Sequence, residues 1–351
     1  MSGRSIARGA LRVVKGLGIA VLVLASVGAI VGAVYQEIGL RRDRTAFPAP
    51  GELVSIGSHA LHIHCLGEGG TPIMLDAGAG GWSLQWFMFH EQLANEGRVC
   101  AFDRSGFGWS EDGVGVRDGE GLAHELHALL AAVGIGPVVY VGHSLGANLA
   151  QIHYRLFPDD IAGLVLIDPG RPVDMLEDFT GTREDAMAIE GCGWKCPAAS
   201  AATRVGLVRF ASRNAGRRTL GERRQRLYNA GLSRQSTART LVGYLDLLPK
   251  TAYQNLDSTD FGDVPLTVVY SGNTREPVGD ETEADVVRWH REVLVDMARL
   301  ASGSTRGRGP VVIEGATHQS IVTEEKYVEP VLEEIRRVVN TARPVGADTG
   351  R

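Results

Sequence analysis

The feature that most constrains the fold is a glycine-flanked pentapeptide between a strand pattern and a helix pattern. Residues 138–141 are apolar and β-branched or aromatic, which favours a buried strand. They run directly into Gly142-His143-Ser144-Leu145-Gly146, and residues 147–157 have helical apolar spacing. A serine at such a turn adopts a strained backbone, and glycine two residues before and after it lets the helix lie close to the strand. The pattern predicts an exposed Ser144 hydroxyl at the N-terminal end of a helix.

Short apolar segments alternate with amphipathic ones over most of the chain. Strands that alternate with helices indicate a mostly parallel sheet with helices on both faces. We therefore predict an α/β fold with an eight-stranded sheet, whose first two strands form a hairpin through Gly57-Ser58. The expected strands are 53–56, 60–66, 72–77, 98–102, 137–142, 163–168, 265–271 and 310–314.

The alternation is interrupted between Asp168 and Pro265, where nearly a hundred residues carry weak helical patterns and no strand pattern. A bare loop of that length is uncommon. We expect a helical cap over the carboxyl edge of the sheet, which is where open α/β folds bind ligands. The predicted organisation is an N-terminal segment 1–45, core 46–169, cap 170–263, core 264–343 and tail 344–351.

The expected cap is rich in arginine. Residues 204–239 contain ten arginines and a single acidic residue, Glu222. A solvated helix face is the simplest interpretation, and contact with anionic lipid headgroups or with an acidic substrate are alternatives that the sequence does not separate. The net charge of −5 over 351 residues gives no overall basic field, so charge predicts no nucleic-acid partner.

The N-terminal segment contains an uncharged run. Residues 17–35 are nineteen residues without a charge, close to the roughly 20 that cross a bilayer as a helix. We predict a single-pass membrane anchor, with the rest of the chain outside the cytoplasm. A signal peptide cleaved after Ala29 or Ala33 and a buried core helix are the alternatives. A cytoplasmic N-terminus is favoured by the basic residues that precede the run, Arg4, Arg8, Arg12 and Lys15.

The chain has four cysteines that can form two disulfides. Cys192 and Cys196 flank a tight turn, while Cys65 and Cys100 each lie at the end of an expected strand. Structural disulfides persist in oxidising compartments, so pairing would agree with a placement outside the cytoplasm. The alternatives are buried thiols or, for the first pair, half of a metal site, although no second Cys or His pair lies nearby at zinc spacing.

A serine hydroxyl needs a base within hydrogen-bond reach, and that base needs an orienting group. His318 is the candidate base, because it follows the last strand in a loop at the edge of the sheet where Ser144 lies. His143 is adjacent to the serine, but the turn directs its side chain elsewhere. His62 and His64 alternate along an early strand, where we expect a polar strand face rather than a metal site.

The orienting acid has three candidates. Asp168 is preferred because it ends the strand after the nucleophile strand, while Glu276 and Asp280 follow the next strand. The oxyanion of the reaction needs two donors. We expect one from the Leu145 N–H and the other from the Ala79 N–H, in a glycine-rich loop where the backbone can approach a substrate carbonyl.

These residues resemble the α/β-hydrolase superfamily, specifically its capped members that carry Asp103-Arg104-Ser105-Gly106-Phe107-Gly108-Trp109-Ser110 after the fourth strand. The resemblance covers residues 50–342 and implies the chain order nucleophile, acid, histidine, which Ser144, Asp168 and His318 follow. Many members carry the acid after the seventh strand. This chain has Glu276 one place late there, whereas lipases and haloalkane dehalogenases carry the acid after the sixth strand, where Asp168 lies.

The resemblance also implies an activity. Epoxide hydrolases and haloalkane dehalogenases are similar to this sequence but use Asp where it has Ser144. What remains is hydrolysis of an ester, thioester or lactone of a small or lipid-like molecule through a Ser-His-Asp triad and an acyl-enzyme, with no metal or organic cofactor. A peptidase, a perhydrolase, a carbon–carbon hydrolase and a non-catalytic membrane-tethered binding module are the alternatives.

Overall fold

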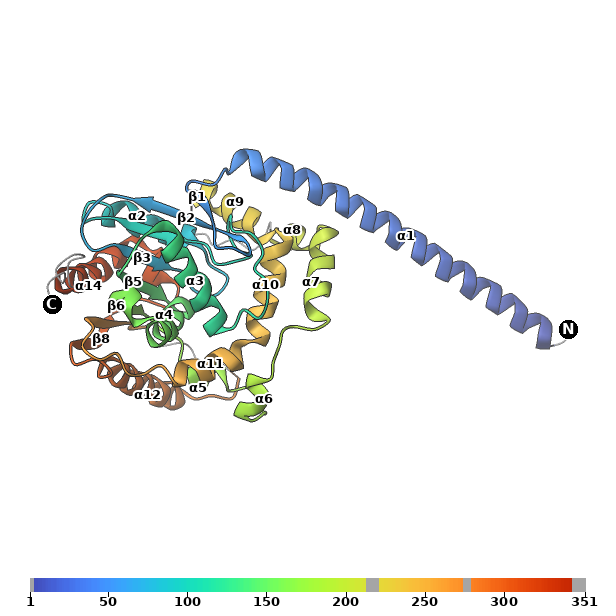
Figure 1. Ribbon diagram of the computed structural model, residues 1–351. Coiled ribbons are helices and arrows are strands. Elements are labelled where there is room, and N and C mark those ends of the chain that lie inside the picture. The colour runs from blue at the N-terminus through green and yellow to red at the C-terminus, as the bar shows by residue number, and fades with distance from the viewer. Residues whose placement is uncertain (1–2, 213–220, 274–278, 343–351) are drawn as a thin grey trace.

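The computed structural model describes residues 3–212, 221–273 and 279–342. Within them, eight strands form one sheet in the order β1-β2-β4-β3-β5-β6-β7-β8 (Figure 1). Only the β1–β2 and β2–β4 pairs are antiparallel, which confirms the predicted mostly parallel α/β fold. The strands are β1 (Glu52–Ser55), β2 (Ala60–Leu66), β3 (Ile73–Asp76), β4 (Val99–Phe102), β5 (Val138–His143), β6 (Ile161–Ile167), β7 (Leu266–Ser271) and β8 (Gly307–Ile313).

Helices cover both faces of the sheet (Figure 1). Apolar side chains of α3, α4 and α12 pack on one face, and those of α2, α13 and α14 pack on the other. Strands β5 and β6 are buried along their whole length, which explains their continuous apolar sequence. These helices are α2 (Phe87–Leu93), α3 (Gly119–Val133), α4 (Leu145–Leu156), α12 (Glu283–Ala301), α13 (Ser320–Thr323) and α14 (Val328–Thr341).

Local sequence signals set the ends of these helices. Helix α3 begins where the Asp118 side chain accepts a hydrogen bond of 2.9 Å from the Gly121 N–H, and it ends at Gly134 in a left-handed conformation. Helix α12 begins with a capping box formed by Thr282 and Asp285. Short 3₁₀ turns complete the described elements: η1 (Ser83–Trp86), η2 (Pro158–Asp160) and η4 (Glu325–Tyr327).

The long segment between β6 and β7 is helical in its described part, as expected. The domain boundaries given above stay a prediction, because the helices alone do not define them. The helices of this segment, which we call the cap, are α5 (Pro172–Met175), α6 (Arg183–Met187), α7 (Lys195–Arg204), α8 (Leu207–Ser212), α9 (Gly221–Leu232), α10 (Gln235–Asp246) and α11 (Leu248–Leu256).

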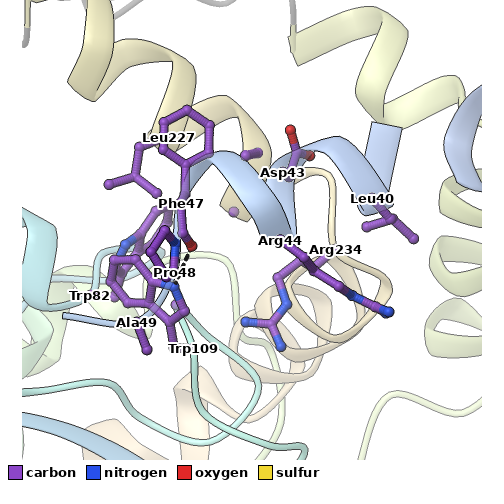
Figure 2. A pocket seen from close by; sticks show the side chains of 13 residues that line it. Leu40, Asp43, Arg44, Phe47, Pro48, Ala49, Trp82, Trp109, Leu227 and Arg234 are labelled. Atoms are coloured by element: carbon purple, nitrogen blue, oxygen red, sulfur yellow. Dashed lines mark hydrogen bonds between the residues drawn. The ribbon is translucent and has the colours of Figure 1, made fainter. Parts of the chain in front are cut away.

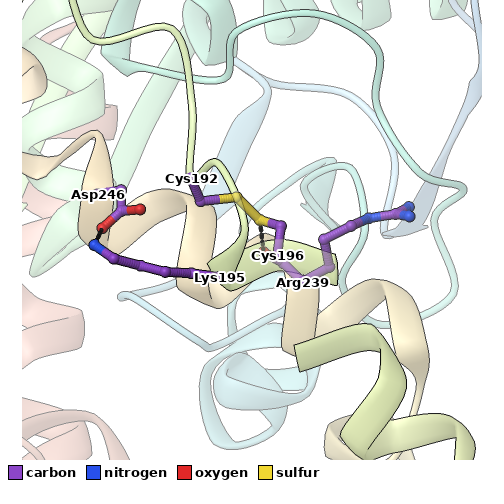
Figure 3. The surroundings of a disulfide bond; sticks show 5 residues. All are labelled: Cys192, Lys195, Cys196, Arg239 and Asp246. Atoms are coloured by element: carbon purple, nitrogen blue, oxygen red, sulfur yellow. Dashed lines mark hydrogen bonds and ion pairs between the residues drawn. A yellow bond between two sulfur atoms is a disulfide. The ribbon is translucent and has the colours of Figure 1, made fainter. Parts of the chain in front are cut away.

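Both candidate disulfides are present. Cys65 and Cys100 face each other in the antiparallel β2–β4 pair, with their Cα atoms 4.0 Å apart. In the cap, Figure 3 shows the Cys192–Cys196 disulfide next to the start of α7, with the Cys196 Sγ atom 3.3 Å from the Arg239 carbonyl oxygen of α10. The ion pair of Lys195 with Asp246 joins the same two helices. The ion pair therefore fastens α7 to α10, while the disulfide ties the start of α7 to the loop that precedes it.

Helix α1 (Gly3–Ala46) projects from the rest of the molecule (Figure 1). Its 44 residues give a length of about 66 Å. Among the described helices it alone is long and apolar enough to cross a membrane. Its last turns pack on the cap: the Gln36 side-chain amide donates to the Ser233 carbonyl at 2.7 Å and accepts from Arg209 at 2.9 Å.

Candidate active site

Ser144 lies at a strained turn between β5 and α4. Its backbone has φ 53° and ψ −122°, an unusual conformation for a residue with a side chain. A Cβ atom at Gly142 would lie 2.4 Å from the Gly146 carbonyl carbon, and one at Gly146 would lie 2.5 Å from the Asp76 carbonyl oxygen. Both glycines are therefore required for the close approach of α4 to β5 and β3.

Three of the predicted site residues come together at the carboxyl edge of the sheet. The His318 Nε2 atom lies 2.9 Å from the Ser144 Oγ atom, and the His318 Nδ1 atom lies 2.7 Å from an Asp168 carboxylate oxygen. Asp168 directly follows β6, and His318 lies in the loop between β8 and α13. Because parallel strands end at the same edge of a sheet, residues 150 positions apart meet here.

The Asp168 carboxylate is buried and held in place by Ser271. The Ser271 N–H donates to one carboxylate oxygen at 3.1 Å, and its hydroxyl donates to the other at 2.8 Å. Burial by itself raises the pKa of Asp168, but the hydrogen bonds from His318 and Ser271 outweigh it and lower this pKa below its ordinary value. Asp168 is therefore held in its charged form. Ser271 was not predicted, although its place at the end of the neighbouring strand is a usable signal.

The other candidates lie elsewhere. Asp280 is exposed, and no hydrogen bond or ion pair among the described residues joins it to His318. Glu276 lies outside the described residues. His143 points away from Ser144, as expected: its Nε2 atom donates to the His318 carbonyl at 2.8 Å, and its Nδ1 atom accepts from Gln85 at 3.0 Å.

The expectation for His62 is wrong. We expected a polar strand face, but His62 is fully buried and its Nδ1 atom lies 2.9 Å from the Asp103 carboxylate. The segment after β4 covers this part of β2, since the Ser110 hydroxyl accepts from the His62 N–H at 2.8 Å. His62 therefore holds the segment after β4 rather than facing solvent. Among the described residues, no group of three or more His, Cys, Asp or Glu side chains could hold a metal ion.

The loop that carries Ala79 lies directly beside Ser144. A Cβ atom at Gly78 would stand 3.2 Å from the Ser144 Cβ atom. In the described residues, neither the Ala79 N–H nor the Leu145 N–H donates to another protein group. Both donors are thus available beside the serine, and Leu145 is the first residue of α4, where backbone N–H groups carry partial positive charge.

The buried Arg104 side chain holds this loop through hydrogen bonds. Its guanidinium donates to the Asp76 carboxylate and the Ala77 carbonyl, both at 2.7 Å, and to the Gly78 carbonyl at 2.6 Å. Burial by itself lowers the pKa of Arg104, but the Asp76 carboxylate outweighs it and raises this pKa, so the side chain stays charged. Arg104 belongs to the motif 103–110, but its role under the loop was not predicted, because the contacts appear only on folding.

Apolar side chains of the core and the cap pack together next to the residue that follows the serine. Trp82 after the loop, Phe107, Leu145 and Tyr244 of α10 belong to one buried cluster. Beside the histidine lies a cavity of about 460 Å³ lined by His318, Asp168, Arg171, Tyr270 and Trp289. The serine thus lies next to an accessible histidine, whose side chain is 46% exposed.

The mostly parallel eight-stranded sheet and the strained serine after β5 define a class of α/β proteins with a serine at the carboxyl edge of the sheet. Comparison with known proteins identifies the family. A model of the alpha/beta hydrolase family matches residues 60–334, so the chain belongs to the α/β-hydrolase family.

Individual proteins share only parts of the sequence. The chain is 36% identical over 126 residues (36% of this chain) to the dihydrolipoyllysine-residue acetyltransferase component of an acetoin cleaving system from Pseudomonas putida. It is 32% identical over 112 residues (30% of this chain) to a (lyso)-N-acylphosphatidylethanolamine lipase from Bos taurus. These matches span about a third of the curated relatives' own lengths, 34% and 33%.

Solved structures share the fold over most of the chain. A thermophilic esterase from Thermogutta terrifontis superimposes with a TM-score of 0.55 at 22% identity, covering 82% of this chain and 98% of the esterase. Epoxide hydrolases are also among the structures that share the fold. At such identities the likeness defines the fold and leaves the chemistry to the site residues.

Proposed function

We propose that this chain is a membrane-anchored serine hydrolase that cleaves an ester bond of a lipid-like molecule. The observation that carries the proposal is the pair of contacts made by His318, one to Ser144 and one to Asp168. A nucleophile, a base and an orienting acid in this arrangement are the requirements for acyl transfer through serine. The hydrolase family and the esterase and lipase relatives support the same class of reaction.

In the proposed reaction the Ser144 Oγ atom attacks the ester carbonyl while His318 Nε2 accepts its proton. The Ala79 and Leu145 N–H groups bind the oxyanion that forms on the carbonyl oxygen. Collapse of this intermediate breaks the ester bond, and His318 gives its proton to the departing alcohol. Water, deprotonated by His318, then attacks the acyl-enzyme; the bond between the acyl carbon and Ser144 Oγ breaks, His318 returns the proton to Ser144, and the acid leaves. Asp168 holds the Nδ1–H of His318 throughout and stabilises the imidazolium.

Two features support a lipid-like substrate at a membrane. The buried apolar cluster of Trp82, Phe107 and Tyr244 includes Leu145, the residue after the serine, so the serine has apolar surroundings. Helix α1 continues without a break from its apolar run into turns that pack on the cap, which favours an uncleaved anchor over a cleaved signal. The two disulfides agree with a catalytic domain outside the cytoplasm.

Replacing the nucleophile tests the proposal. In the full-length protein, S144A should lower the hydrolysis of p-nitrophenyl esters of graded chain length by about 10⁴-fold or more, because the acyl-enzyme no longer forms. A fluorophosphonate should label the unchanged protein at Ser144, as identified by peptide mass spectrometry. Full esterase activity in S144A, or a label on another residue, would contradict the proposal. An epoxide panel is the control, and we expect no turnover by either protein.

A further inference from the structure

A second cleft lies away from the serine, between the end of α1 and the cap. It has a volume of about 620 Å³, and four arginines line it together with apolar and small polar residues. Arg42 belongs to α1, Arg209 to α8, and Arg223 and Arg226 to α9.

Only part of this positive charge is compensated. Arg209 pairs with Asp43 at 2.8 Å, and Arg226 pairs with Glu222 at 2.8 Å. Among the described residues, no carboxylate lies within ion-pair distance of Arg42 or Arg223. The cleft therefore presents two uncompensated cations, which suits an anion.

The position of the cleft along α1 indicates where that anion comes from. The apolar run of α1 ends at Tyr35, and Tyr35 and Ile38 line the cleft on the side of that run. Arg42 follows seven residues later, about 10 Å further along the helix, and its long side chain can reach back toward the membrane surface. With α1 across a bilayer, the cleft lies at the height of the lipid headgroups.

Helix α8 lies at the same height. A Cβ atom at Gly32, inside the apolar run of α1, would lie 2.2 Å from the Val205 carbonyl oxygen just before α8, so the two backbones are in close contact. From α8, Leu207 and Phe210 project with 59% and 66% of their surfaces exposed. An apolar pair at this depth is suited to the interface of the bilayer.

A pocket with an aromatic side and an arginine side adjoins the cleft. It has a volume of about 240 Å³, and Asp43, Phe47 and Ala230 line both spaces. Figure 2 shows Phe47, Trp82 and Trp109 gathered on one side of this pocket and Arg44 and Arg234 on the other. The arginine cleft is therefore continuous with apolar surface, as an amphiphile requires.

We propose that this cleft binds the phosphate headgroup of an anionic phospholipid from the bilayer that α1 crosses, with Arg42 and Arg223 as its principal ligands. The bound lipid holds the cap on the membrane surface. This proposal rests on the proposed membrane placement of α1 and does not depend on the proposed ester chemistry.

The test uses the full-length protein in detergent micelles and native mass spectrometry with phosphatidylglycerol as the probe. The variant R42Q/R223Q should bind this lipid roughly 30-fold more weakly, because two cations near the headgroup are lost. The matched control R288Q/R299Q removes two arginines from α12, far from the cleft, and should bind as the unchanged protein does. Phosphatidylcholine should not compete, and soluble glycerol phosphate should not displace the lipid.

Several results would overturn the proposal. If R42Q/R223Q bound the lipid as tightly as the unchanged protein, or if R288Q/R299Q lost as much affinity as R42Q/R223Q, the affinity would come from charges outside the cleft. Displacement by glycerol phosphate would make the cleft a site for soluble anions. Thermal unfolding of each variant checks that it is folded, and R42K/R223K, which keeps both charges, should retain binding. Extraction of the protein from membranes by alkaline carbonate would overturn the membrane placement itself, whereas fluorophosphonate labelling of Ser144 reports the ester chemistry separately.

Discussion

The proposed role of the Asp168 carboxylate, which is to orient His318, can be tested with a substitution that replaces one oxygen atom. D168N keeps the size of the side chain but removes the charge that stabilises the imidazolium. We expect kcat for ester hydrolysis to fall by about 10³- to 10⁴-fold. D280N is the matched control and should be as active as the unchanged protein, since Asp280 is exposed. A larger loss in E276Q than in D168N would assign the acid to Glu276 instead.

The same substitution should change the pH dependence of stability. The lowered pKa of Asp168 means that its carboxylate contributes stability above the pKa of the unfolded chain. That contribution is lost as the pH falls through the lower folded-state pKa. The difference in free energy of unfolding between the unchanged protein and D168N should therefore be largest above about pH 4 and shrink in more acidic solution. Urea unfolding at several pH values measures it.

In the proposed mechanism Arg104 is a positioning residue, because it would act through the loop that carries Ala79. R104K keeps the charge, but a single ammonium group does not reproduce the guanidinium's contacts with Asp76, Ala77 and Gly78. We expect kcat to fall by about 10- to 100-fold with little change in KM, because the oxyanion forms only in the transition state. R155K, at an ion pair away from the loop, is the control. A rise in KM at unchanged kcat would show that Arg104 acts on substrate binding instead.

Sequence patterns find some of these residues and miss others for a physical reason. Ser144, Asp168 and His318 each follow a strand, and the ends of parallel strands converge, so their meeting could be predicted. Gln85 connects the Gly78 N–H with His143, which depends on the path of a loop, and no pattern predicts it. His62 appeared to belong to an alternating polar face, because the segment that covers it follows a different strand.

At the scale of elements, the two disulfides should contribute unequal stability. Cys65 and Cys100 are 35 positions apart, and Cys192 and Cys196 only 4, so the first closes a much longer loop in the unfolded chain. By loop-closure entropy, the first contributes about 4 kcal/mol and the second about 2 kcal/mol. Urea unfolding of C65A/C100A and C192A/C196A should show this order. The opposite order would mean that contacts in the cap, rather than chain entropy, dominate.

The strands were easier to predict than the cap. The continuous apolar runs of β5, β6 and β7 predict strands, and these segments are buried strands in the folded protein. In the cap, α5, α6 and α8 have only four to six residues each, too short for a helical period to be recognised. Such short helices owe their structure to packing on their neighbours. The absence of strand patterns predicted a helical segment between β6 and β7, but its individual helices could not be predicted and its bounds as a domain stay a prediction.

At the scale of the whole molecule, the contact between α1 and the cap predicts different outcomes for two truncations. Removal of residues 1–31 takes away most of the apolar run but keeps Gln36 and Asp43 on Arg209. Removal of residues 1–45 takes away both partners of the Arg209 side chain, which is 11% exposed when α1 is in place. The loss of these charged contacts, worth about 2 kcal/mol, should lower the melting temperature of the shorter protein by about 4–8 °C relative to the longer one.

Differential scanning fluorimetry of both truncations in one detergent measures this difference. Equal melting temperatures would mean that α1 is only a tether. Both truncations should hydrolyse a soluble ester, because neither removes a residue beside Ser144.

The joint between α1 and the cap has a consequence for kinetics. A domain on a loose linker samples all orientations and meets its substrate as a solute. Gly32 and Gln36 of α1 contact the cap, so if α1 crosses a bilayer as proposed, the serine is held at one height and one tilt above the lipid. The relevant substrate quantity is then the mole fraction in the bilayer rather than molarity. The rate of hydrolysis by such an enzyme would then fall when other lipids dilute the substrate within the bilayer. It would not change when buffer dilutes the whole suspension.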